Sequence, residues 1–580
     1  MTSYLKKGTL AAALMASAIC ISIPAYAAVA PKPEPPKDLG SQPGNYLAAL
    51  VASAESDTAS AEDYYRKTLE ADPNNLELLQ RAFLAALSNG DQATANSLGE
   101  RLFARDPNNK VVRLATAVHF ILNGQYSAAR ARLAPNIRPR DLTTLFVAAW
   151  TYEGQADLKH ALAMLDQVRD PALVPFRDYH AGLIADQLGA QGEANRRFKA
   201  AFDSNKSTLR FAEAYGRFLA AHGDAASARQ VYTDFSRVVP NHPTIEQAVA
   251  DLDAGRTPDP FIHNAKDGAA EVLYGLGGEG TRQGGEELPS LIYLRLSQFL
   301  RPNDDLTAIT LANLLDRLKQ GEAAVTAYES VPASSPLKSD AEIQVALELD
   351  SIGKGPEARA RLAQMVAKQP HDVDALTAYA GLLRMDKKYA EAAALYDKAI
   401  AAIGIPQSEN WPLFYFRGIC YERDKQWPKA EADFKKALEL RPDQPQVLNY
   451  LGYSWVDQGV NLEQAFKMLQ RAVDLRPNDG YIVDSLGWAH YKLGQYQQAA
   501  DTLEKAVNLK PSDPVLNDHL GDAYWRVDRR NEARFQWNHA RDSNPEPDDL
   551  PAILKKIEYG LPDPQPSHAA DAPAEKNKGG

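Results

Sequence analysis

The sequence predicts an all-α protein, a solenoid in which antiparallel helix hairpins stack one on another. Two observations lead to this prediction. A pattern of large apolar residues, a glycine, two alanines and a proline recurs roughly every 34 residues, and no segment alternates apolar and polar residues as a half-buried strand does. A hairpin with this pattern has an apolar face left over, which only its neighbour can cover. We therefore expect a superhelix of roughly fourteen hairpins.

The beginning of the sequence has the features of a secretory signal peptide. Two lysines precede an apolar run at residues 10–23, and Ala25-Tyr26-Ala27 follows as a cleavage site. The run is shorter than the roughly 20 residues that a membrane-spanning helix needs. We expect residues 1–27 to be removed during export to the periplasm, and residues 28–43, which contain five prolines, to form an extended linker.

The charge and the cysteines narrow the class of protein further. The whole chain has a formal net charge of −11. A negative surface repels phosphate groups, so nucleic acid is not an expected partner. Cys20 lies inside the signal peptide and follows the bulky Ile19, which does not fit a lipid-attachment site. Cleavage would leave Cys420 alone, so no internal disulfide can form, and its apolar neighbours predict a buried thiol.

The repeat is most regular in residues 411–547, which hold four consecutive units. The first unit contains Phe414, Gly418, Tyr421, Ala430, Phe434, Ala437 and Pro442. These residue types at this spacing resemble the tetratricopeptide repeat, a hairpin of two helices. The small Gly418 and Ala430 allow the two helices to approach closely, and Tyr421 and Phe434 fill the space around the crossing. Pro442 helps to end the second helix.

The same spacing continues, with more divergence, on both sides of a break. At residues 243–266 the pattern fades, and Gly255, Pro258 and Pro260 mark the break. We therefore expect the following organisation: an N-terminal arm at 44–242, an irregular connection at 243–266, a C-terminal arm at 267–547, a capping helix at 548–561 and a disordered tail at 562–580.

Motifs that carry chemistry are weak or absent in this sequence. Residues 275–280 have the spacing G-x-G-x-x-G, but no strand precedes them, so a flexible turn between two helices is the better interpretation. The eleven histidines show no metal-binding spacing, and neither H-E-x-x-H, C-x-x-C nor G-x-S-x-G occurs. We expect no enzymatic activity, no cofactor and no metal site.

The resemblance to tetratricopeptide repeats implies where a partner would bind. In that family the first helix of each hairpin lines a concave groove, and side chains at fixed positions of the repeat point into it. In this sequence those positions are occupied by Tyr415, Asn449, Tyr453, Tyr481, Asp484, Trp488, Tyr491, Lys492, Asp518, Asp522, Trp525 and Arg526. Aromatic rings beside amides and charges suit a peptide or protein partner. Alternatively, the rings pack between helices and the charges only solvate the surface.

The closing repeats also resemble a narrower group. Residues 449–455, 479–488 and 518–525 are similar to the last repeats of exported proteins of Gram-negative bacteria, some of which act as adaptors that present cell-wall hydrolases to a carboxyl-terminal processing protease. The resemblance implies a non-catalytic periplasmic scaffold that links a protease to envelope substrates and reaches the outer membrane only through a partner. The alternative is an assembly or secretion component that docks to an outer-membrane export system.

Overall fold

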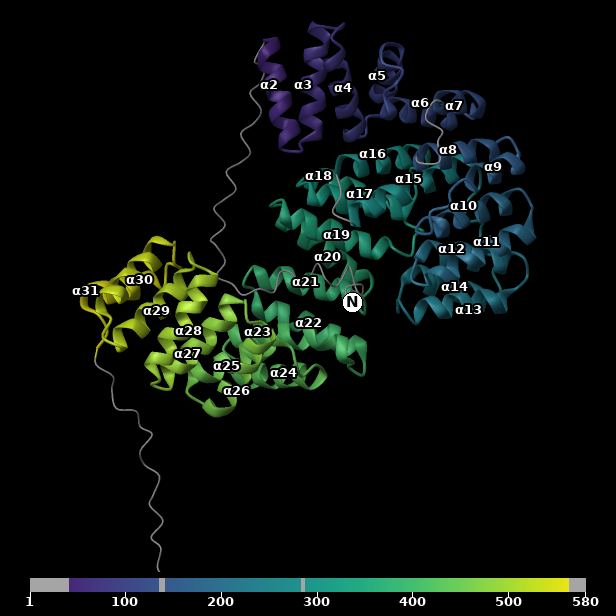
Figure 1. Ribbon diagram of the computed structural model, residues 1–580. Coiled ribbons are helices and arrows are strands. Elements are labelled where there is room, and N and C mark those ends of the chain that lie inside the picture. The colour runs from purple at the N-terminus through teal and green to yellow at the C-terminus, as the bar shows by residue number, and fades with distance from the viewer. Residues whose placement is uncertain (1–40, 135–140, 283–286, 563–580) are drawn as a thin grey trace, which may run out of the picture. The chain divides into compact units, whose positions relative to one another are not determined.

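The computed structural model describes residues 41–134, 141–282 and 287–562. The expected signal peptide, nearly all of the linker and the tail beyond residue 562 lie outside the described residues. Within them every regular element is a helix: 30 α-helices, α2 to α31, and one short 3-10 helix at Ser408–Asn410. Consecutive helices pack as antiparallel pairs (Figure 1). The predicted all-α hairpin fold is therefore confirmed.

The described residues form two compact units, one ending at Lys368 and one beginning at Gln369. We call them the N-terminal unit and the C-terminal unit. The first six hairpins of the N-terminal unit are α2 (Gln42–Ala54) with α3 (Thr58–Ala71), α4 (Leu76–Asn89) with α5 (Gln92–Arg105), α6 (Lys110–Leu122) with α7 (Tyr126–Leu133), α8 (Leu142–Glu153) with α9 (Leu158–Leu165), α10 (Val174–Gln187) with α11 (Gln191–Ser204), and α12 (Leu209–Ala221) with α13 (Ala225–Ser236).

A single helix and three more hairpins complete the N-terminal unit: α14 (Pro243–Asp253), α15 (Ala265–Arg282) with α16 (Glu287–Leu300), α17 (Asp305–Arg317) with α18 (Gly321–Glu329), and α19 (Lys338–Ser351) with α20 (Gly355–Lys368). Residues 243–253 were expected to be irregular and are helical instead. Pro243 fits the first turn of a helix, where a missing N–H costs nothing, and Ile245 anchors α14 in the core. Within the expected connection at 243–266, only residues 254–264 are not helical.

The C-terminal unit continues the same plan. Its hairpins are α21 (Val373–Met385) with α22 (Tyr389–Ile403), α23 (Trp411–Arg423) with α24 (Trp427–Leu440), α25 (Pro445–Gln458) with α26 (Leu462–Leu475), α27 (Gly480–Lys492) with α28 (Tyr496–Leu509), and α29 (Pro514–Arg526) with α30 (Arg530–Asp542). The last helix, α31 (Leu550–Tyr559), packs against α30 and buries Ile553 beside Trp537. Together the two units hold fourteen hairpins among the described residues.

Close approach within a hairpin depends on glycine where the sequence predicted it. A Cβ atom at Gly418 would lie 2.7 Å from the ring of Phe434, and one at Gly521 would lie 2.4 Å from the ring of Trp537. Real Cβ atoms do not come this near to another heavy atom, so any larger residue would force the two helices apart. The small residue on the first helix and the aromatic residue on the second are therefore one packing unit.

The glycine-rich segment 275–280 is not a turn, contrary to the sequence prediction. It lies inside α15, and its glycines face neighbouring helices at short range. A Cβ at Gly275 would lie 2.7 Å from Phe176 of α10, and one at Gly268, earlier in the same helix, 2.2 Å from Trp150 of α8. Glycine disfavours a helix by about 1 kcal/mol, but here it lets α15 fit against large aromatic side chains. Tertiary packing thus decides the structure of this segment.

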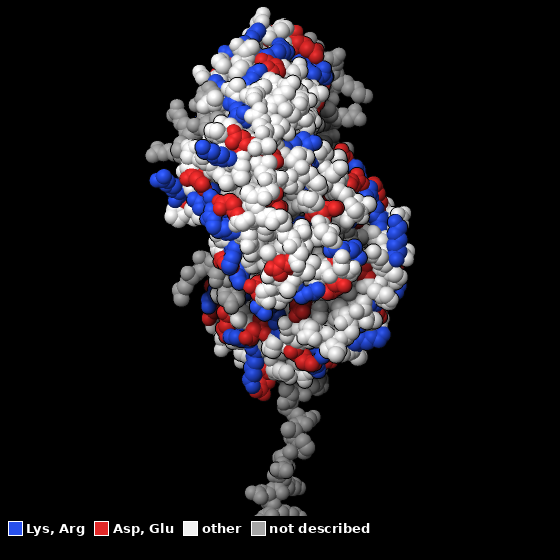
Figure 2. Space-filling view, turned by 90° about the vertical axis from the view of Figure 1, so that its right-hand side faces the viewer, with Lys and Arg blue, Asp and Glu red and all other residues white. Residues whose placement is uncertain are grey.

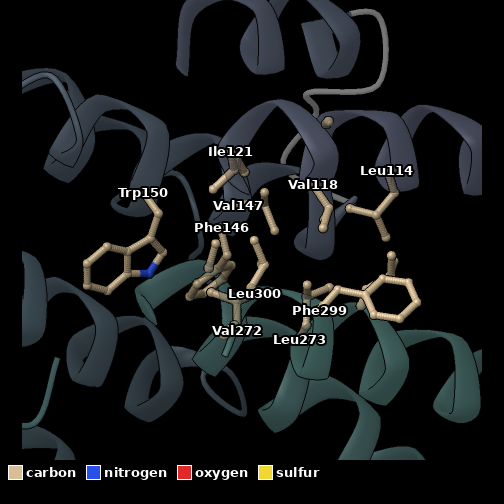
Figure 3. Close-up of a cluster of buried hydrophobic side chains, with 14 of the residues drawn as sticks. Leu114, Val118, Ile121, Phe146, Val147, Trp150, Val272, Leu273, Phe299 and Leu300 are labelled. Carbon is tan, nitrogen blue, oxygen red and sulfur yellow. The ribbon is translucent and has the colours of Figure 1, made fainter. Parts of the chain in front are cut away.

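Helices α15 and α16 lie across the first helices of earlier hairpins. Helix α15 contacts α6, α8 and α10, and α16 contacts α4 and α6 (Figure 1). Figure 3 shows the apolar side chains that meet there: Leu114, Val118 and Ile121 of α6, Phe146, Val147 and Trp150 of α8, Val272 and Leu273 of α15, and Phe299 and Leu300 of α16. This packing explains why α15 to α20 belong to the N-terminal unit, and not to the C-terminal arm expected to begin at residue 267.

A buried ion cluster links α12, α15 and the start of α17. The guanidinium of Arg210 on α12 lies 3.0 Å from Asp304 at the start of α17, 3.4 Å from Glu271 on α15 and 3.2 Å from Glu213 on its own helix. All four side chains are buried. Buried charges that have lost their water are stable only when paired, so each of these partners depends on the others.

Candidate functional site

The first helices α25, α27 and α29 form one layer of the C-terminal unit. Helix α27 contacts both α25 and α29, so equivalent positions of successive repeats become neighbours. Of the twelve residues predicted for the groove, only Tyr415 lies outside this layer. The layer carries the remaining residues: Asn449 and Tyr453 on α25; Tyr481, Asp484, Trp488, Tyr491 and Lys492 on α27; and Asp518, Asp522, Trp525 and Arg526 on α29.

Tyr415 does not line a groove and belongs to the core. Only 1% of its surface is exposed, because its ring packs among Trp411, Phe416, Phe434 and Tyr450. For this residue the alternative interpretation, that the rings pack between helices, is the correct one. The repeat position alone could not separate the two cases, since an aromatic residue suits either environment.

Three rings stack at the centre of the layer. The half-buried indole of Trp488 lies parallel to Tyr491, with ring centroids 4.7 Å apart and 5° between the planes. It also lies almost parallel to His519 of α29, at 4.1 Å and 14°. Stacking of this kind adds about 0.5–1.5 kcal/mol to the burial of each pair. His519 was not among the residues predicted to line the groove.

His519 is held by the buried carboxylate of Asp484. Its Nδ1 lies 3.0 Å from an oxygen of Asp484, across the interface between α27 and α29. Burial lowers the pKa of His519, but the Asp484 carboxylate more than offsets this effect, and the pKa lies above its ordinary value of 6.5. The pair therefore joins two repeats by charge as well as by stacking.

Polar contacts extend the layer on either side of this stack. Arg526 donates from Nε to the hydroxyl oxygen of Tyr491, at 3.2 Å. Nζ of the exposed Lys492 lies 3.5 Å from Asp457 of α25. Tyr453 is half-buried, and burial together with nearby Asp484 raises its pKa well above 10, so its hydroxyl stays protonated. The layer thus carries aromatic rings together with charges of both signs.

Two predicted residues have less accessible polar atoms. The side-chain oxygen of Asn449 is buried and has no hydrogen-bond partner among the described residues. The ring of Tyr481 is half-buried, and Nζ of Lys510 lies 4.7 Å from its centroid. The part of both residues in binding stays a prediction.

The carboxylates of α29 are already paired with α31. Nζ of Lys556 lies 2.6 Å from Asp518 and 2.9 Å from Asp522. Asp522 also accepts a hydrogen bond from the indole N–H of the buried Trp537, at 2.9 Å. Burial lowers the pKa of Lys556, but the two carboxylates raise it more strongly, so the lysine keeps its charge. Lys556 is thus a groove contact that the repeat pattern could not reveal.

The end of α29 contacts the segment that follows α31. The indole N–H of Trp525 donates to the carbonyl oxygen of Leu561 at 3.1 Å, and Arg526 donates from Nη1 to the carbonyl oxygen of Pro562 at 2.7 Å. The aromatic face of Trp525 packs on Gly560, where a Cβ atom would lie only 2.0 Å away. Residues 560–562 therefore occupy the predicted binding position of α29.

The described residues show few features of a metal-binding, catalytic or membrane-spanning site. No group of three or more His, Cys, Asp or Glu side chains there could hold a metal ion. Cys420 is fully buried, and burial raises its pKa to about 12, so the thiol is unreactive near neutral pH. No described helix is both long and apolar enough to cross a membrane. On the described surface that Figure 2 shows, basic and acidic side chains are intermixed among uncharged ones.

Comparison with known proteins supports the repeat assignment for part of the chain. Residues 309–543 match the family model described as tetratricopeptide repeat. The TPR repeat-containing protein PA4667 of Pseudomonas aeruginosa is 29% identical over 201 residues, 34% of this chain and 32% of the relative. The match thus spans about a third of the length of that protein.

Two solved structures also show a weak similarity to this chain. The crystal structure of the APC/C hetero-tetramer Cut9–Hcn1 gives a TM-score of 0.38 at 14% identity, with 89% of this chain and 96% of that chain covered. Yeast Tom70 gives 0.29 at 13% identity, with 90% and 95% covered. At these scores the two structures carry no functional information for this chain.

Proposed function

We propose that this chain, whose residues 309–543 are tetratricopeptide repeats, is a non-catalytic scaffold that holds a protein partner on the layer formed by α25, α27 and α29. One observation carries the proposal: the half-buried rings of Trp488 and Tyr491 stack on α27 beside the exposed Lys492, and α27 packs against α25, which carries the half-buried Tyr453. Rigid rings give a large contact area at a small entropic cost, and the neighbouring charges orient the partner.

The proposal includes a location and a kind of partner. We place the scaffold in the periplasm because residues 1–27 have the pattern of a signal peptide. We further propose that it is an adaptor between a protease and envelope substrates such as cell-wall hydrolases. The similarity of the closing repeats to exported adaptor proteins supports this choice. The rival, docking to an outer-membrane export system, has no particular observation in its favour.

The test is capture of partners by the full chain, expressed with its own first 27 residues and purified from envelope extract. Trp488→Ala removes the central ring of the stack and is expected to reduce partner recovery at least tenfold. Trp427→Ala is the matched control, since Trp427 is also half-buried but lies on α24, a second helix outside the layer. Mass spectrometry identifies the bound proteins, and far-UV circular dichroism checks that both variants fold.

Each outcome separates the hypotheses. A protease or a cell-wall hydrolase that is lost with Trp488→Ala and retained with Trp427→Ala supports the adaptor. Subunits of an export pore that are lost with Trp488→Ala and retained with Trp427→Ala support the alternative. Equal recovery of partners by the two variants would mean that the layer does not hold the partner. Recovery of the chain from the cytoplasmic fraction alone would contradict the proposed periplasmic location.

A further inference from the structure

The segment after α31 is bound by its own protein in the manner of a peptide ligand. Trp525 and Arg526 supply N–H donors, and the partners on the segment are the backbone carbonyl oxygens of Leu561 and Pro562. An indole and a guanidinium can only donate, so they select a backbone that offers acceptors. Proline suits this demand, because it offers a carbonyl and has no N–H to satisfy.

The backbone conformation and the surroundings of Gly560 add a second element of recognition. Its backbone has φ 73° and ψ −169°, a conformation open to glycine and very few other residues. The ring of Trp525 fills the space that a side chain would need. Leu561 packs with Trp525 and Ile557 on the apolar cluster around Trp537. A glycine, an apolar residue and a proline thus each have a distinct place.

The N-terminal unit repeats the same chemistry on different residues. There the irregular segment 259–262, which contains Pro260, is held by Gln187 at the end of α10 and by Arg217 of α12. Again both contacts run from a side-chain N–H on a first helix to a backbone carbonyl, of Ile262 and of Asp259. Two first-helix surfaces of the chain therefore bind a proline-containing segment through its carbonyl groups.

From these contacts we infer that Trp525 and Arg526 form a recognition site for an extended glycine–apolar–proline segment of a partner protein, and that residues 560–562 close this site in the free chain. The inference rests on the proposed function, since it names the chemistry of one partner segment and the way its binding is regulated. A tethered segment has an effective concentration of the order of millimolar, so it weakens a competing peptide by about 10- to 100-fold.

The test uses the full chain and a fluorescein-labelled peptide with the sequence of residues 557–562, followed by fluorescence anisotropy. Gly560→Ala expels the tethered segment by its clash with Trp525. Leu561→Asp expels it without backbone strain, by loss of its apolar contacts, and serves if the first variant folds poorly. Gly381→Ala is the matched control, because a Cβ there meets no other atom within 4 Å.

Both opened variants are expected to bind the peptide about 10- to 100-fold more tightly than the parent, while the control binds like the parent. Adding Trp525→Phe to Gly560→Ala removes the indole donor and must weaken binding again. A peptide with alanine in place of Gly560 must not bind. Peptide binding by the parent protein must itself reach saturation at millimolar peptide. This measurement still tests the inference if neither opened variant folds.

Equal affinity of parent and opened variants, or no effect of Trp525→Phe, would overturn the inference. Partner capture through Trp488 is scored in a separate experiment. Failure of peptide binding with intact capture therefore contradicts only this inference, and failure of capture with intact peptide binding contradicts only the proposed function.

Discussion

Glu153 is a carboxyl group whose ionisation opposes folding. It is the last residue of α8, only 8% exposed, and its Oε2 has no hydrogen-bond partner among the described residues. Burial raises its pKa from 4.5 to about 7. The negative end of the helix dipole at this position disfavours an anion as well. We therefore predict that Glu153→Gln stabilises the N-terminal unit at alkaline pH.

The magnitude follows from the two pKa values. Because the pKa rises from 4.5 to about 7, the ionised carboxylate costs the folded protein about 3 kcal/mol relative to the unfolded chain. A group whose pKa is raised on folding favours the folded state fully below its unfolded pKa, and this contribution is lost as pH rises through the folded value. Parent and Glu153→Gln should thus be similar in stability near pH 4.5, and the variant should be more stable by about 2–3 kcal/mol at pH 8.

The assay is guanidinium unfolding followed by far-UV circular dichroism at pH 5, 6.5 and 8. A chain of stacked hairpins need not unfold in one step, so hydrogen exchange at the amides of α8 measures the local effect. Glu246→Gln, at an exposed glutamate in the first turn of α14, is the matched control and should show no gain in stability at pH 8. A difference between Glu153→Gln and the parent that is the same at pH 5 and pH 8 would refute the reasoning.

Three other substitutions test separate features. Gly268→Ala places a Cβ 2.2 Å from Trp150, so we expect the melting temperature to fall, with a loss of about 1–3 kcal/mol. Arg210→Met removes the buried guanidinium that Glu213, Glu271 and Asp304 share, and urea unfolding should show a loss of about 3–5 kcal/mol. The pKa of His519 is raised by Asp484, so this pair stabilises the fold below pH 6.5 and the stability falls as pH rises through the folded pKa. His519→Gln should abolish that fall in urea titrations between pH 6 and 9.

The sequence predicted those features that repeat at a fixed spacing. Gly418 opposite Phe434 is such a feature, because both residues belong to one hairpin and their contact recurs in its neighbours. The glycines of α15 do not fit this logic. Their partners Trp150 and Phe176 lie far back in the sequence, and a local pattern of glycines predicts a turn unless such distant contacts are known.

The candidate site also has one part that the repeat positions predicted and one part that they could not predict. Repeat positions predicted the layer of α25, α27 and α29, since equivalent residues of successive first helices become neighbours. They could not predict that Tyr415 is fully buried, or that Lys556 and residues 560–562 lie against α29. Those contacts come from outside the repeat, where no spacing relates a residue to its partner.

The packing of α15 and α16 on earlier first helices has a consequence for how the chain can fold and vary. In a solenoid with nearest-neighbour contacts, stability is a sum over adjacent repeats and folding can start anywhere. The N-terminal unit departs from this rule, since Arg295 of α16 donates to the carbonyl of Ser88, and Thr58 donates to Gln320. Its contact order is therefore high, and its folding should be slow and cooperative. Deleting or duplicating a single hairpin between α4 and α14 would also shift the earlier first helices relative to α15 and α16 and break their contacts. The C-terminal hairpins carry no such constraint among their described contacts, so repeat number can change there more freely.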